Sequence, residues 1–238
     1  MEKKEIKLSI IVPCFNESEN IPLVFEKFHN RINRSDIEVL FINNGSTDNS
    51  EEIFDHLIPN YSFARVIKIK KNIGYGFGIT TGLEEAKGKF IGYMHADMQT
   101  DPNDMLKALK ILEKQTDPKN CLIKGDRKGR SIFDQIFTLG MSLFESIYLG
   151  SKLWDINAQP NIFHRGFFDI IKHNCPKDFS LDLYILYMAK KKNLNVIRFD
   201  VKFPKRTYGI SKWNTGVIAK WKFIKRTIDF SIKLKKEL

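Results

Sequence analysis

The sequence predicts an α/β fold: a Rossmann-like, mostly parallel sheet with helices on both faces, plus amphipathic C-terminal helices. Short β-rich runs alternate with segments of helical period through the first half of the chain. Polar clusters follow these runs directly, as loops at the carboxyl ends of parallel strands do. Apolar residues make up 42% of the 238 residues, enough for one sizeable core.

Five strands are expected in the first half of the chain. Each run is short and bounded by Asn, Gly, Pro or charged residues: 8–15, 37–43, 65–70, 89–95 and 122–124. The first helix between them has four apolar residues on one face, which are Val24, Phe25, Phe28 and Ile32. The helix after the fourth strand begins at Asp101 and Pro102, a capping residue followed by a proline in the first turn.

The charge balance indicates the kind of partner. Lys and Arg total 39 against 28 Asp and Glu, a net charge of +11, which favours phosphates, nucleic acid or an acidic membrane face. Three widely spaced cysteines exclude a disulfide scaffold and a four-thiolate zinc site and suit a reducing compartment. We expect no signal peptide, because charged residues lead straight into a strand-like run with no small-residue cleavage site. We also expect no bilayer-spanning helix, because no run of about 18 uncharged apolar residues occurs.

Three polar clusters follow three of the expected strands. Residues 13–17 follow the first strand, residues 43–48 the second and residues 95–99 the fourth. Each cluster alone is compatible with an ordinary turn, because Asn-Gly and Asp-Pro are turn signals. Together they predict a site, because the carboxyl ends of parallel strands meet at one edge of a sheet.

Five motifs, in this order, resemble glycosyltransferase family 2, and within it the dolichol-phosphate mannosyltransferase-like branch. They are LSIIVPCFNESENIP at 8–22, FINNGSTDNS at 41–50, the segment 72–102 that runs through His-Ala-Asp-Met-Gln, Gly-Asp-Arg at 125–127, and Lys-Arg-Thr-Tyr-Gly-Ile-Ser-Lys at 205–212. The resemblance covers most of the chain. It implies the GT-A nucleotide-sugar-binding fold and sugar transfer with inversion at the anomeric carbon.

The resemblance implies a donor pocket. Pro13, Phe15 and Glu17 would line the nucleotide pocket, and Ile42 and Asn44 would touch the base or ribose.

The resemblance also implies a diphosphate and metal site. The matching residues are His95, Ala96, Asp97 and Gln99, with Mg²⁺ or Mn²⁺ on Asp97 and Gln99 and, in one interpretation, on His95. Arg127, Arg206 and Lys212 would contact the phosphates, so Asp97, Arg127 and Arg206 are the expected catalytic residues. A hard cation and arginine side chains suit this role, because both stabilise charge that develops on a leaving diphosphate.

Two positions depart from the family pattern. His95 stands where members commonly have Asp, and Asn43-Asn44 replaces an Asp pair. A neutral His removes negative charge beside the cation but still ligates Mn²⁺, so we hypothesise weak metal affinity with Mn²⁺ preferred. His95 is equally compatible with a satisfied strand-end side chain. Asn44 keeps an acceptor and adds donors, so it still suits a nucleotide.

Two amphipathic segments lie outside these motifs. Residues 1–212 are expected to form the GT-A domain, with an interface segment at about 131–150, and 213–238 to form a basic amphipathic helix. The first segment has one apolar face: Ile132, Phe133, Ile136, Phe137, Leu143, Phe144 and Ile147. The C-terminal helix has an aromatic and aliphatic stripe: Trp213, Val217, Trp221, Ile224 and Ile228. Both faces either pack on the sheet or each other, or lie at a membrane interface, which the basic composition favours for the second.

The acceptor decides whether a catalytic base is needed. The branch resemblance implies a polyprenyl phosphate, which is largely ionised and needs none, at the cytoplasmic membrane surface, where the protein would be peripheral on the inner face. A sugar hydroxyl acceptor, as in polysaccharide or lipopolysaccharide synthesis, needs one, and Asp182 lies near the expected position.

Two alternatives come from other classes. A basic nucleic-acid-binding protein would explain the charge but not the carboxylates at the predicted anion-binding edge. A non-catalytic subunit would explain the missing aspartates. We therefore expect no nucleic-acid partner, and a nucleotide-diphosphate sugar and a lipid-linked acceptor as substrates.

Overall fold

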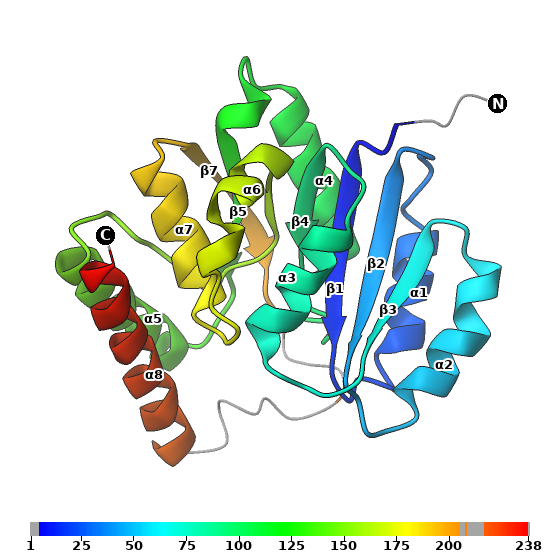
Figure 1. Cartoon of the computed structure of the whole chain (residues 1–238), viewed down its shortest axis with the longest axis horizontal. Helices are drawn as coiled ribbons and strands as arrows, with labels where there is room; N and C mark the ends of the chain where they lie inside the picture. Colours follow the sequence, from blue (N-terminus) through cyan, green and yellow to red (C-terminus); the bar gives the residue numbers. More distant parts are fainter. Residues whose placement is uncertain (1–4, 205–207, 209–216, 238) are drawn as a thin grey trace.

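The computed structural model describes residues 5–204, 208 and 217–237. A seven-stranded sheet has the order β3-β2-β1-β4-β6-β5-β7 (Figure 1). Its strands are β1 (Leu8–Cys14), β2 (Ile37–Asn44), β3 (Ala64–Ile69), β4 (Phe90–Tyr93), β5 (Cys121–Lys128), β6 (Asn161–His164) and β7 (Asn195–Lys202). All neighbouring strands pair in parallel except at β6, which is antiparallel to both β4 and β5.

The mostly parallel sheet is confirmed, and all five expected strands form. The expected strand 89–95 ends early, at Tyr93, because the chain turns at the polar cluster that follows. The expected strand 122–124 is longer in the structure and continues through the Gly-Asp-Arg motif to Lys128. Strands β6 and β7 were not predicted from the sequence.

Helices cover both faces of the sheet, as expected. Their bounds are α1 (Ile21–His29), α2 (Ser50–Leu57), α3 (Tyr75–Glu85), α4 (Pro102–Glu113), α5 (Ile132–Tyr148), α6 (Arg165–Ile171), α7 (Leu181–Lys191) and α8 (Val217–Lys236), with single 3₁₀ turns at Ile58–Asn60, Pro118–Asn120 and Lys172–Asn174. One core cluster includes side chains of α1, α2 and α4, and the other includes side chains of α3, α6 and α7. The sheet therefore separates two apolar layers.

Local sequence explains how these helices start and pack. The Asp101 carboxylate accepts a hydrogen bond from the Asn103 backbone N–H at 2.8 Å, so the expected cap of α4 is present. Phe25 of α1 stacks on Phe41 of β2 with 4.1 Å between ring centroids. Gly82 lets α3 approach β1, since a Cβ there would lie 2.6 Å from the side chain of Ile11.

Helices α5 and α8 form a pair at one side of the sheet (Figure 1). The Ser231 hydroxyl on α8 donates to Glu145 Oε2 on α5 at 2.5 Å, and Lys235 Nζ donates to the Tyr148 carbonyl at 2.8 Å. Within the described ranges, none of the helices combines the length and apolarity that crossing a bilayer requires. The expected domain boundary at 212–213 lies outside the described residues.

Candidate functional site

The first two polar clusters come together at the carboxyl edge of the sheet. Asn16 Oδ1 accepts from the Thr47 backbone N–H at 2.8 Å, and the Asn16 N–H donates to Ser46 Oγ at 3.1 Å. The Ser18 N–H donates to Asp48 Oδ2 at 3.2 Å. Because β1 and β2 are adjacent and parallel, their loops are joined side chain to backbone, as the strand-end rule predicts.

The residues expected to line the nucleotide pocket lie at the end of β1 and in the loop that follows it. Pro13 and Phe15 are partly buried at the end of β1. Glu17 Oε2 accepts from Asn20 Nδ2 at 2.6 Å, and the Glu17 carbonyl accepts from the Ile21 N–H at 2.9 Å. Glu17 therefore connects the loop after β1 to the start of α1.

Asn44 ends β2 with one side-chain atom satisfied and one not. Its Nδ2 donates to the Gly74 carbonyl at 3.0 Å, whereas its buried Oδ1 has no hydrogen-bond partner among the described residues. A buried acceptor without a donor is costly, so this atom suits a donor group supplied by a ligand or water. Ile42, two residues earlier, is fully buried in the core and offers no exposed surface in this conformation.

The His-Ala-Asp-Met-Gln segment forms a tight turn after β4. Asp97 is only 4% exposed, and its Oδ1 accepts from the Gln99 N–H at 3.1 Å. Thr100 Oγ1 donates to the His95 carbonyl at 3.0 Å, while Ala96 is buried beneath the turn. Gln99 Nε2 donates to the Pro204 carbonyl at 2.9 Å, which joins the turn to the chain that follows β7.

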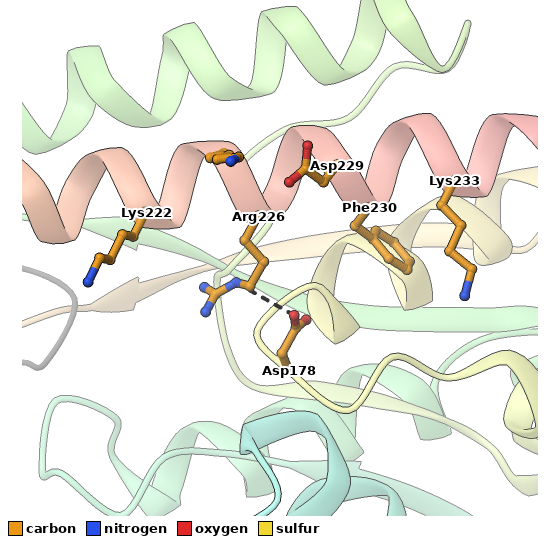
Figure 2. A pocket seen from close by; sticks show the side chains of 7 residues that line it. Asp178, Lys222, Arg226, Asp229, Phe230 and Lys233 are labelled. Atoms are coloured by element: carbon orange, nitrogen blue, oxygen red, sulfur yellow. Dashed lines mark ion pairs between the residues drawn. The ribbon is translucent and has the colours of Figure 1, made fainter.

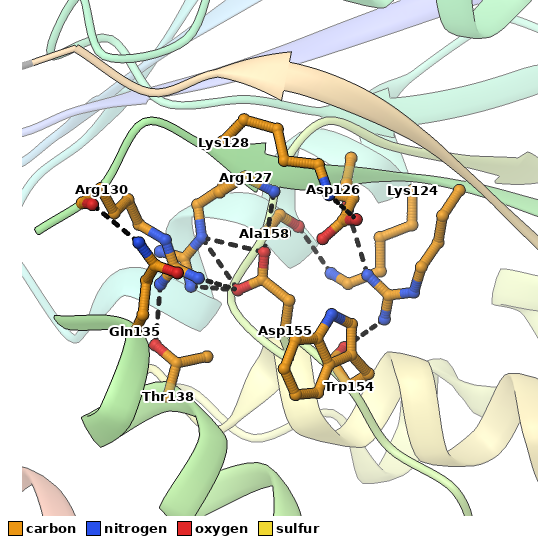
Figure 3. A network of polar contacts seen from close by, with 12 residues as sticks. Lys124, Asp126, Arg127, Lys128, Arg130, Gln135, Thr138, Trp154, Asp155 and Ala158 are labelled. Atoms are coloured by element: carbon orange, nitrogen blue, oxygen red, sulfur yellow. Dashed lines mark hydrogen bonds and ion pairs between the residues drawn. The ribbon is translucent and has the colours of Figure 1, made fainter. Parts of the chain in front are cut away.

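Arg127, near the end of β5, shares a buried carboxylate with Arg130. Arg127 Nε and backbone N–H each lie 3.0 Å from an oxygen of Asp155, which has no exposed surface (Figure 3). Arg130 Nη2 lies 3.5 Å from the same carboxylate, and its Nη1 donates to Thr138 Oγ1 on α5 at 2.7 Å. Burial alone would raise the pKa of Asp155, but the two arginines lower it, so the carboxylate is ionised and orients both cations.

A row of polar side chains lies beneath the edge where β4, β6 and β5 meet. Asn161 of β6 stands opposite both Tyr93 and Lys124 in the strand register. Lys124 Nζ donates to Asn161 Oδ1 at 2.9 Å, and burial lowers the pKa of Lys124 to about 7. Asp182 Oδ1 accepts from the Tyr93 hydroxyl at 2.7 Å, and Asp182 Oδ2 accepts from the Tyr75 hydroxyl at 3.3 Å.

Burial, reinforced by Asp182, raises the pKa of both tyrosines, so their hydroxyls stay protonated and donate to the carboxylate. Asp182 is therefore buried beneath the edge with both oxygens hydrogen-bonded.

An aromatic stack extends from His95 to α8. The His95 ring lies 5.5 Å from Tyr75, and Tyr75 stacks on Phe179 at 4.5 Å with an interplanar angle of 9°. The Arg226 guanidinium lies 5.1 Å from the centroid of the Phe179 ring. Four planar groups from four segments therefore connect the turn after β4 with the C-terminal helix.

Helix α5 exposes its apolar face and buries polar side chains, the opposite of an ordinary surface helix. Its apolar side chains are exposed, with Phe133 at 85% and Ile147 at 74%, and the same face includes Ile132, Ile136, Leu139, Leu143 and Phe144. The two buried residues of the helix are polar, Ser142 and Glu145. The apolar face of α5 therefore does not pack on the sheet, and the membrane interface expected for this segment stays a prediction.

Two predicted site residues lie outside the described part of the chain, and several residues that the structure places at the site were not predicted from the sequence. Arg206 and Lys212 fall outside the described residues. Asp155 and Asn161 belong to a segment that carried no recognised motif, and Phe179 lies in a loop. The sequence offered one usable signal: Tyr75 lies inside the segment 72–102 that resembles the family.

No group of three or more His, Cys, Asp or Glu side chains gathers as a metal cage within the described part of the chain. Asp97 is accompanied instead by an imidazole and an amide, those of His95 and Gln99.

The sheet order and the joined loops at its carboxyl edge define an α/β domain of the GT-A type. The family model "Glycosyl transferase family 2" matches residues 9–137, and the chain belongs to this family. Among solved structures, glucosyl-3-phosphoglycerate synthase from Mycobacterium tuberculosis in complex with UDP has a TM-score of 0.71 at 15% identity, covering 95% of this chain and 79% of that one. A mannosyltransferase from Pyrobaculum calidifontis in complex with GDP-Man and Mn²⁺ has a TM-score of 0.67 at 16% identity, covering 94% and 61%.

Curated relatives are more similar in sequence. An uncharacterised glycosyltransferase, YkcC, of Bacillus subtilis is 30% identical over 135 residues, 55% of this chain and 41% of that protein. Dolichyl-phosphate beta-glucosyltransferase of Dictyostelium discoideum is 24% identical over 220 residues, which are 83% of this chain and 66% of that protein. Dodecaprenyl-phosphate galacturonate synthase of Rhizobium johnstonii is 26% identical over 177 residues, which are 71% of this chain and 51% of that protein. The chain thus spans 41% to 66% of the length of these three relatives.

Proposed function

We propose that this protein transfers a sugar from a nucleotide-diphosphate sugar to a polyprenyl phosphate, with inversion, at the cytoplasmic face of a membrane. The observation that carries the proposal is the exposed apolar face of α5. This helix leaves the sheet just after β5, at the edge where Arg127 and the polar loops lie. A lipid-linked acceptor held by α5 would therefore present its phosphate beside the donor site.

The donor side is supported by three groups at the carboxyl edge. Asn44 Oδ1 offers an acceptor to the nucleoside, Asp97 offers a carboxylate, and Arg127 offers a guanidinium held in place by Asp155. A planar guanidinium suits phosphate oxygens, and preorganised charge needs no rearrangement as the diphosphate leaves. In this proposal Pro13, Phe15 and Glu17 border the nucleoside.

The donor atoms near Asp97 fit a divalent cation that arrives with the substrate. One carboxylate, with the amide of Gln99 and the imidazole of His95, suits Mg²⁺ or Mn²⁺ when phosphate oxygens complete the coordination. When bound, the cation would stabilise negative charge on the leaving diphosphate. Mn²⁺ in the Pyrobaculum complex supports the proposal of a divalent metal.

The acceptor side is supported by the burial of Asp182. A sugar hydroxyl would need a base within reach, yet the Asp182 carboxylate is buried and accepts hydrogen bonds from two tyrosines. A phosphate monoester is already ionised and needs no base. The names of the Dictyostelium and Rhizobium relatives, both of which specify a polyprenyl phosphate, agree with this acceptor.

The test is a transfer assay with purified protein, Mn²⁺ or Mg²⁺, a panel of UDP- and GDP-sugars, and undecaprenyl or dolichyl phosphate. We expect lipid-linked sugar from the wild type, at least 100-fold less from Asp97→Ala, and turnover within a few-fold of wild type from Asp182→Asn. Melting curves of both variants verify that they fold. Transfer to sugar hydroxyls alone, abolished by Asp182→Asn in a folded protein, would overturn the lipid-phosphate acceptor.

A further inference from the structure

A basic recess lies between α8 and the loop that precedes α7. It has a volume of about 410 Å³ and is lined by Asp178, Lys222, Lys225, Arg226, Asp229, Phe230 and Lys233. Figure 2 shows the side chains of Lys222, Arg226 and Lys233 on the same side of α8 as Phe230, with Arg226 directed at Asp178. None of these residues belongs to the motifs that resemble the family.

The recess carries more positive than negative charge. Four cationic side chains face two carboxylates, and the carboxylate of Asp178 lies 3.7 Å from Arg226 Nε. Among the described residues, no carboxylate forms an ion pair with Lys222 or Lys225. Burial lowers the pKa of Arg226, because the charged guanidinium is partly removed from water. Lys233 Nζ also lies 3.6 Å from Glu237, outside the lining, so Lys222 and Lys225 are the two lining cations without an ion pair in the described part of the chain, and an anionic group would suit them.

The recess is also connected to the donor edge. Arg226 is the outer member of the stack that passes through Phe179 and Tyr75 to His95, in steps of 5.1, 4.5 and 5.5 Å. The same helix exposes Trp221 at 64%, one residue from Lys222, and aromatic side chains of this kind favour the boundary between lipid and water. The recess therefore lies near an exposed indole and is linked to the strand-end site through the rings of Phe179 and Tyr75.

We propose that this recess receives the phosphate of the lipid acceptor before that phosphate reaches the donor edge. The ligand class is a lipid phosphate monoester, an anion that Lys222 and Lys225, the two lining lysines without an ion pair among the described residues, would attract. Lys222 and Lys225 bind the phosphate, and Arg226 orients it above the Phe179 ring. This proposal rests on the proposed function, since it names where that acceptor enters.

The test compares two double variants that remove equal charge. Lys222→Gln/Lys225→Gln empties the recess of two cations, whereas Lys191→Gln/Lys192→Gln removes two exposed lysines at the opposite end of α7 from Asp178. Binding is measured by sedimentation with phosphatidylcholine vesicles that contain undecaprenyl phosphate or, in a second arm, the phosphodiester phosphatidylglycerol. Inorganic phosphate serves as a soluble competitor, and melting curves check folding.

We expect the recess variant to lose about 10- to 30-fold in affinity for undecaprenyl phosphate vesicles, since each lysine near an anionic surface contributes a factor of about three to five. The control should lose less than twofold, and phosphatidylglycerol binding should fall less than undecaprenyl phosphate binding. In the transfer assay, the recess variant should raise KM for the lipid and leave KM for the nucleotide sugar unchanged. Equal losses in both double variants, or equal losses on both lipids, would overturn the recess as an acceptor site. Sedimentation needs no turnover, so absence of transfer with intact recess binding would count against the proposed function alone.

Discussion

The buried carboxyl of Glu145 makes the stability of the α5–α8 pair depend on pH. Its side chain is fully buried, Oε2 accepts from Ser231 Oγ, and Oε1 has no hydrogen-bond partner among the described residues. Burial, only partly offset by the Ser231 hydrogen bond, raises the pKa of Glu145 from 4.5 to about 7. The folded state therefore favours the neutral acid. This stabilising contribution is complete below pH 4.5 and is lost as the pH rises through about 7.

Replacing Glu145 with Gln removes the titration. The shift sets an upper limit of about 3 kcal/mol, at 1.36 kcal/mol for each pKa unit, and solvent screening reduces the expected effect to about half of that. For a chain of this size, about 1.5 kcal/mol corresponds to roughly 3–6 °C in melting temperature. We expect Glu145→Gln to melt that much above wild type at pH 8 and to match it at pH 5.

The assay is thermal unfolding followed by circular dichroism between pH 5 and 8.5. Glu26→Gln, on the exposed side of α1, is the matched control and should follow the wild-type curve. Parallel wild-type and Glu145→Gln curves across this range, or a variant that melts below wild type at pH 8, would refute the argument that burial governs this carboxyl.

Two further changes test other parts of the molecule. Asp155→Asn should weaken nucleotide-diphosphate binding about tenfold and destabilise the fold by about 3 kcal/mol, because it leaves two partly buried arginines without their carboxylate. Isothermal titration measures the binding and denaturant unfolding the stability, with the exposed Asp200→Asn as the control. Unchanged binding in the Asp155 variant would contradict the orienting role. Phe133→Gln/Ile136→Gln should reduce sedimentation with vesicles at least tenfold while leaving the melting temperature within about 2 °C, since both side chains are exposed; a matching fall in melting temperature would mean that they pack within the protein instead.

The sequence revealed features that depend on local pattern. The strand-end rule located the loops after β1, β2 and β4, because a strand, its turn and the following polar residues are neighbours along the chain. The capping of α4 was equally visible, since Asp101 and Pro102 are adjacent. Strands β6 and β7 were both missed, and β7 is a partly exposed edge strand whose apolar signal is weak.

Features that depend on long-range contacts could not be predicted. Asp155 meets Arg127 across 28 residues, and nothing beside Asp155 in the sequence signals a partner. The period of α5 revealed an apolar face but not its direction, because in a soluble domain such a face normally turns inward. The stack of His95 on Tyr75 likewise brings together the turn after β4 and the start of α3, which only the fold makes adjacent.

The contact of Arg127 with Asp155 also joins the two ends of the segment that contains α5. The chain leaves the sheet at the end of β5, forms α5, and returns through Asp155 to β6, so the two partners stand at the departure and return points of the helix. Arg130 contacts both Asp155 and Thr138 of α5, so it joins the helix to the point where the chain leaves and rejoins the sheet. Arg130 thus links α5 directly to the carboxylate that orients the Arg127 guanidinium at the end of β5.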